Sequence, residues 1–101
     1  MASNYIKVNT GALKHDGDEL ESLVKRAESQ LAKITDGMEA LSKMWTGPAN
    51  DAFMKQYYID NEFLLSLCKQ VDSFSRDLKN AATEYDRCED GVMDAVRRIK
   101  V

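Results

Sequence analysis

Side chains able to perform chemistry are few in this chain and lie far apart. The 101 residues include one histidine, His15, and two cysteines, Cys68 and Cys88. Catalysis needs an acid, a base or a nucleophile that converge in a concave site. The sequence has no Ser-His-Asp set, no phosphate-binding loop and no metal-ligating cluster. We therefore expect no enzymatic activity, no cofactor and no metal site.

The two cysteines are predicted to be free. They lie twenty residues apart within one long helical pattern. At ~1.5 Å per residue this separation is roughly 30 Å, whereas a disulfide needs Cα atoms within ~7 Å of each other. The spacing matches no metal or redox motif. Buried or half-buried thiols that act as small apolar side chains are the expectation.

Composition limits the class of protein further. The chain is 44% hydrophobic and 31% charged, which is typical of one small domain built from amphipathic helices. Fourteen basic and seventeen acidic residues give a net charge of −3, which argues against a nucleic-acid partner. The basic residues Arg97, Arg98 and Lys100 are better explained by the negative end of a helix dipole.

The sequence shows neither a cleaved signal peptide nor a membrane-spanning stretch. Synthesis in the cytoplasm is therefore expected, and export would follow a route that needs no cleaved leader. Membrane insertion is not expected, because the charges are spread around the helices instead of forming a basic amphipathic face.

Apolar residues follow a heptad period in both halves of the chain. In the first half, the stripe runs through positions 13, 17, 20, 24, 27, 31, 34, 38, 41 and 45. In the second half, it runs through 53, 57, 60, 64, 67, 71, 74, 78, 81, 85, 88, 92, 95 and 99. This period predicts two long helices that pack side by side. Asp60 interrupts the second stripe, either as a register-setting polar residue or turned outward.

The only tryptophan, Trp45, and the only proline, Pro48, flank the single break in this pattern. Gly47 precedes the proline, which suits the first turn of a new helix. The sequence predicts one all-α domain over residues 1–101, with a helix at about 10–44, a turn at 45–47 and a helix at about 48–96. So short a turn between long helices makes an antiparallel two-helix hairpin.

A single hairpin cannot bury all of the apolar surface, which widens in the middle of the second helix. A homodimer that forms a four-helix bundle is the simplest closure. The interface is predicted at Tyr58, Ile59, Phe63, Leu64, Leu67 and Val71. With an antiparallel partner and a two-fold axis near residue 65, Trp45 of one chain lies level with Tyr85 of the other. Within one chain these two residues would be roughly 57 Å apart.

Trp45-Thr46-Gly47, at a central helix break in a hairpin of this length, resembles the signature of the WXG (Trp-x-Gly) family. These are the ESAT-like small proteins that bacterial type VII, or ESX, secretion systems export. The similarity covers essentially the whole chain. The stretches IKVNTGALK and WTGPANDAF are similar to the versions found in Gram-positive Firmicutes.

The resemblance also implies a C-terminal signal, Tyr-x-x-x-Asp/Glu, which Tyr85 and Glu89 match within a secretion tail at about 85–101. A longer form of the signal adds apolar residues, here Val92 and Val96. These four side chains share one helix face and could form a docking ridge. Tyr58 has the same spacing to a glutamate, but lies in the presumed dimer face. Trp45 could also simply seal the end of the hairpin as a core residue.

The resemblance implies a secreted, folded dimer that the type VII secretion ATPase recognises through the Trp-x-Gly turn and the tail. A homodimer is expected. A heterodimer with a related WXG protein, or with the helical domain of a larger type VII toxin, is the alternative. In the second case the chain would be an export adaptor or chaperone.

Overall fold

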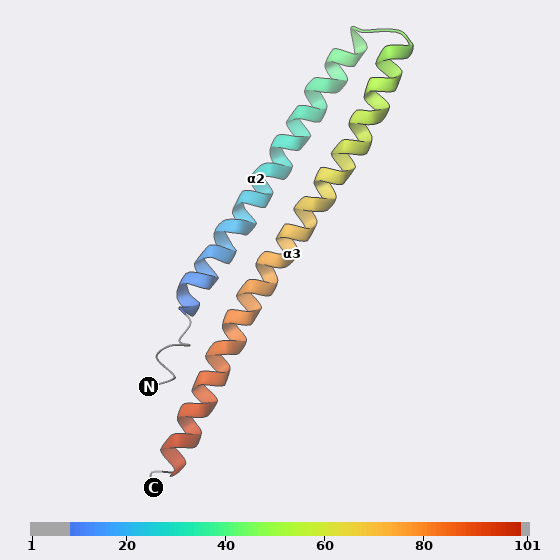
Figure 1. Cartoon of the computed structure of the whole chain (residues 1–101). Helices are drawn as coiled ribbons and strands as arrows, with labels where there is room; N and C mark the ends of the chain where they lie inside the picture. Colours follow the sequence, from blue (N-terminus) through green and yellow to red (C-terminus); the bar gives the residue numbers. More distant parts are fainter. Residues whose placement is uncertain (1–8, 100–101) are drawn as a thin grey trace.

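The computed structural model describes residues 9–99; residues 1–8, 100 and 101, including the end of the predicted tail, lie outside the described part. Two helices, α2 (Thr10–Lys43) and α3 (Pro48–Ile99), form an antiparallel hairpin (Figure 1). The all-α hairpin fold is thereby confirmed. It is a thin rod with extents of 82 × 19 × 17 Å. α3 continues to Ile99, beyond the expected end near residue 96.

Local hydrogen bonds explain where α2 begins and where the chain turns. The side chain of Asn9 caps α2, because its Oδ1 accepts a hydrogen bond from the amide of Ala12 at 3.0 Å. At the other end, the amide of Trp45 donates to the carbonyl of Ser42 at 3.2 Å. Gly47 has φ +126°, a conformation that other residues rarely adopt. The next residue, Pro48, opens α3 as expected.

The helices meet along a line that coincides with only some positions of the predicted apolar stripe. On α2 the seam runs through Lys14, Gly17, Glu21, Val24, Glu28, Leu31, Thr35, Met38 and Ser42; Thr10, Leu13 and Leu20 are also half-buried. On α3 the seam runs through Met54, Tyr57, Asn61, Leu65, Cys68, Asp72, Ser75, Lys79, Ala82 and Asp86; Asn50, Val71, Leu78, Thr83 and Tyr85 are also half-buried. Every second seam position on α2 is therefore polar. On α3 most seam positions lie one residue after the predicted stripe.

Only part of each predicted stripe therefore faces the other helix, although the two helices pack side by side as expected. Ile34 and Leu41 on α2 are 50% and 51% exposed. Phe53, Leu64 and Phe74 on α3 are 44%, 42% and 59% exposed. The physical reason is a small rotation of both helices, which brings polar groups into the seam and turns the apolar stripes to its flank.

Asp60, which the sequence left ambiguous, is exposed and accepts a hydrogen bond from Gln56 at 2.9 Å. It sets no register within the seam. Both cysteines are free as expected; Cys68 is half-buried, but Cys88 is exposed, contrary to the expected burial.

Candidate functional site

The turn displays an apolar cluster at the tip of the hairpin. The Trp45 ring lies 5.8 Å from the Phe53 ring, centroid to centroid, in a tilted arrangement. Trp45 is 43% exposed, Phe53 44%, and the neighbouring Met44 79%. A residue that merely sealed the end of the hairpin would be buried. We call Leu41, Met44, Trp45 and Phe53 the tip cluster.

The predicted tail lies at the opposite end of the rod (Figure 1). Tyr85 is half-buried beside the first turn of α2, and Glu89 is exposed. Val92 and Val96 are 56% and 44% exposed. α2 starts opposite Asp86, so within residues 9–99 no other helix lies beside α3 beyond that residue.

The structure does not bring tip and tail together within one chain. The helical residues from Pro48 to Tyr85 separate them by roughly 55 Å at ~1.5 Å per residue. A surface that contains both Trp45 and Tyr85 therefore requires a second molecule.

An apolar face runs along one side of the hairpin. Equivalent flanking positions of two antiparallel heptad helices lie on the same side of the pair, so the displaced stripes of α2 and α3 join. A groove of about 240 Å³, with no polar lining, marks the middle of this face. Its walls are Leu20, Leu23, Val24 and Ala27 on α2 and Leu67, Cys68 and Val71 on α3.

The predicted interface residues divide between different sides of α3. Leu64, Leu67 and Val71 belong to the apolar face, and two of them line its groove. Tyr58 lies on the opposite side, where its hydroxyl donates to Glu39 at 2.7 Å across the seam. That hydrogen bond, more than burial or charge, raises the pKa of Tyr58.

Ile59 and Phe63 are 53% and 68% exposed. By helical periodicity they point away from α2, and Phe63 leans toward the apolar face.

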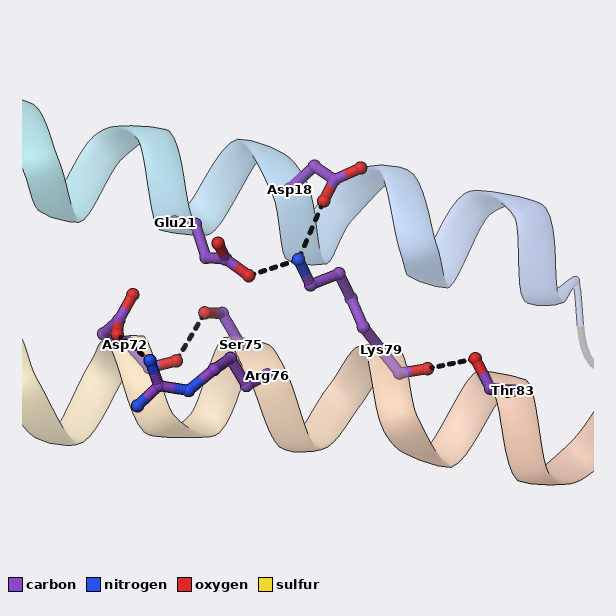
Figure 2. Close-up of polar contacts among 7 residues, drawn as sticks. All are labelled: Asp18, Glu21, Asp72, Ser75, Arg76, Lys79 and Thr83. Atoms are coloured by element: carbon purple, nitrogen blue, oxygen red, sulfur yellow. Dashed lines mark hydrogen bonds and ion pairs between the residues drawn. The ribbon is translucent and has the colours of Figure 1, made fainter.

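A polar hub joins the helices near their open end, and the sequence analysis did not foresee it (Figure 2). Lys79 crosses from α3 and pairs with Asp18 at 2.9 Å and with Glu21. Both carboxylates raise its pKa, Glu21 the more strongly. Gly17 allows this crossing, since a Cβ there would lie 2.5 Å from Cγ of Lys79. Polar residues at 14, 21, 28, 35 and 42, one per heptad, were the signal for a polar seam.

Other polar contacts tie the seam on either side of this hub. Lys14 Nζ lies 2.8 Å from Asp86 Oδ2, and this contact is the main reason that the pKa of Asp86 is lowered. Nearer the tip, the hydroxyls of Thr35 and Tyr57 are 2.8 Å apart. The seam therefore aligns the two helices through polar contacts and leaves apolar surface exposed on its flank.

Neither a metal-ligand cluster nor a membrane-spanning helix is found among the described residues. Over residues 9–99, no three His, Cys, Asp or Glu side chains are grouped to hold a metal ion. Neither described helix has a stretch that is both long and apolar enough to cross a bilayer.

The described residues form a helical hairpin with the Trp-x-Gly sequence at its tip. A comparison with protein families shows which family the chain belongs to. The family model described as proteins of 100 residues with WXG matches residues 5–90. The chain belongs to the WXG100 family. WXG100 proteins are small helical secretion substrates, not enzymes. Neither the curated proteins nor the solved structures compared with the chain give a match.

The match to WXG100 covers only part of the candidate signal. It includes the turn with Trp45 and Gly47 and the pair Tyr85 and Glu89. It ends at residue 90, before Val92 and Val96. The family match therefore does not extend to Val92 and Val96.

Proposed function

We propose that this WXG100 protein is type VII secretion cargo, exported as a folded antiparallel homodimer. The type VII ATPase would read a signal made by the tip of one chain and the tail of its partner. Trp45, Gly47, Tyr85, Glu89, Val92 and Val96 carry the signal. The observation that carries the proposal is the continuous apolar face, which one hairpin leaves uncovered.

The position of the groove fits an antiparallel pairing whose two-fold axis passes through it. It lies at residues 67–71 of α3, close to halfway between Pro48 at the tip and Asp86 at the start of α2. A two-fold axis through the groove therefore makes the two-helix parts overlap over their full length. The same axis puts Phe53 level with Tyr85 of the second chain. Large apolar side chains then meet one another, which is the main source of stability in such bundles.

Export from a strain with the cognate secretion system tests the signal. Trp45→Ala, and separately Tyr85→Ala with Glu89→Ala, should abolish export while the proteins remain folded and dimeric. Tyr58→Ala with Glu62→Ala is the matched control, because it removes the same Tyr-x-x-x-Glu spacing away from the tail. Equal export of all three variants would eliminate the signal assignment.

Co-expression tests whether two chains build the signal. A Trp45→Ala chain retains the wild-type tail, and a Tyr85→Ala, Glu89→Ala chain retains the wild-type tip. Their heterodimer has one complete composite site, whereas neither homodimer has any. With random pairing, about half of the chains are in heterodimers, so export should recover to roughly half of the wild-type level. Absence of any recovery would show that each chain must carry both elements itself.

A further inference from the structure

The turn between the helices is exposed, yet hydrogen bonds fix the path of its backbone. Residues 43–49 are all exposed, so no buried core holds them in place. Two half-buried residues flank this stretch: Ser42 in the last turn of α2 and Asn50 in the first turn of α3. We call the contact between Ser42 and Asn50 the turn clamp.

The turn clamp uses both ends of the Asn50 amide. Ser42 Oγ donates to Asn50 Oδ1 at 3.0 Å, and Asn50 Nδ2 donates to the carbonyl oxygen of Ser42 at 3.4 Å. This carbonyl lies in the last turn of α2, where carbonyl groups lack a partner within their own helix. It also accepts a hydrogen bond from the amide of Trp45 at 3.2 Å. Asn50 is therefore bonded to the same atom that holds the backbone of Trp45.

The turn clamp also sets the spacing of the two aromatic rings in the tip cluster. Trp45 lies before the turn, and Phe53 lies on α3 three residues after Asn50, about one helical turn farther along. The ring centroids are 5.8 Å apart although both side chains are strongly exposed. Their contact depends on where α3 starts relative to the end of α2. Of the hydrogen bonds described between the two helices, those of the turn clamp lie closest to the tip.

We propose that Asn50 is a positioning residue for the side chain of Trp45. Asn50 fastens the first turn of α3 to the end of α2 and so holds the tryptophan in one orientation at the tip. A recognition side chain that is already ordered loses less conformational freedom on binding. One that adopts the binding orientation only part of the time binds more weakly in proportion. The inference rests on the proposed function for its consequence in export, but not for the orientation of the ring.

Fluorescence of the full-length protein tests the positioning, because Trp45 is the only tryptophan. In Asn50→Ala both hydrogen bonds of the turn clamp are lost. The amplitude of subnanosecond motion in time-resolved anisotropy should therefore rise at least about twofold. Ser42→Ala and Asn50→Asp each keep one of the two hydrogen bonds, so each should give an intermediate rise. Asn80→Ala, at an exposed asparagine of the same helix, is the matched control and should leave the anisotropy unchanged.

Asn50→Asp separates the orientation of the ring from the stability of the helix. A carboxylate in the first turn of α3 interacts favourably with the helix dipole, so this variant should not weaken α3. It cannot donate to the Ser42 carbonyl, so the ring should still gain mobility. We expect unchanged helicity by circular dichroism together with a raised anisotropy amplitude. Loss of helicity in step with the amplitude across the series would overturn the proposal, as would wild-type anisotropy in Asn50→Ala.

The tail of a second chain is the competing support for the tryptophan ring. Tyr85→Ala with Glu89→Ala removes that support and leaves the turn clamp intact. If this variant frees the ring and Asn50→Ala does not, the second chain orients Trp45 and the proposal is wrong. If Asn50→Ala frees the ring in both the wild-type and the tail-variant background, the turn clamp acts within one chain, as proposed.

Export gives a separate readout of the consequence. Asn50→Ala should lower secretion at least about twofold, although Trp45, Gly47 and the tail are all retained. Wild-type export of Trp45→Ala would contradict the proposed signal itself and leave the fluorescence test of the turn clamp untouched. Loss of export in Trp45→Ala, with wild-type export of Asn50→Ala, would overturn the positioning role and leave the proposed function standing.

Discussion

Replacement of Gly17 by alanine tests how closely the helices approach at the polar hub. A Cβ at this position would lie 2.5 Å from Cγ of Lys79 and 3.2 Å from the carbonyl oxygen of Ser75. Cγ lies near the start of the lysine side chain, so it cannot move aside without shifting the stem. Ser75 is fully buried, and its carbonyl belongs to the backbone of α3. The helices must separate locally, or Lys79 must leave its two carboxylates.

Two opposing effects set the size of the change. Alanine is a better helix former than glycine by about 1 kcal/mol in a helix interior. Overpacking of a closely packed site costs about 1–3 kcal/mol. We expect the packing term to win and Gly17→Ala to lower the free energy of unfolding by about 1 kcal/mol.

Gly37 and Gly91 are the matched controls, because a Cβ at either position would meet no atom within 4 Å. Gly37→Ala should raise the free energy of unfolding by about 1 kcal/mol, since only helix propensity changes there. Urea unfolding followed by circular dichroism, at one fixed protein concentration, measures both changes in the free energy of unfolding. Adding Lys79→Ala to Gly17→Ala should recover part of the loss. If Gly17→Ala stabilises the protein as much as Gly37→Ala, the close approach at the hub is refuted.

Three further predictions follow from the dimer and the seam. A spin label on Cys88, with Cys68→Ser, should give an interchain distance of about 57 Å in an antiparallel dimer with its axis at the groove; a distance near 20 Å would mean parallel pairing. Leu67→Asp should weaken dimerisation at least about 100-fold in sedimentation or light scattering, because it places a carboxylate in the apolar interface; an unchanged dimer would move the interface elsewhere. Because Lys14 lowers the pKa of Asp86 in the folded protein, this pair contributes stability above the unfolded pKa of the carboxyl group. The contribution should be lost as the pH falls through the lowered pKa, and an NMR titration showing a normal or raised value would contradict the assignment.

The heptad period and the single break made the hairpin predictable. A run of alternating three- and four-residue spacings can hardly be satisfied except by two long helices. The tip was also predictable, since Gly47 and Pro48 end one helix and begin the next. The exposure of Trp45 was not, because pattern alone leaves both a buried and an exposed role open.

A pattern analysis that counts only apolar residues could not predict which residues form the seam between the helices. Gly17 was one position of the predicted stripe, yet it is the position where the Lys79 stem crosses α2. Tyr58 looked like part of the apolar patch, yet its hydroxyl pairs with Glu39 on the other side. Rotation of a helix by a fraction of a turn costs little in local energy, so contacts between the helices decide it.

Sequence by itself therefore determined the helices, their break, and the positions of the two proposed recognition elements at opposite ends. Local hydrogen bonding and periodic burial act over a few residues, and such short-range preferences can be read from residue order. Only the tertiary structure decided which face of each helix meets the other. That choice depends on long-range fits, such as a glycine on α2 against a lysine on α3, which residue order does not reveal.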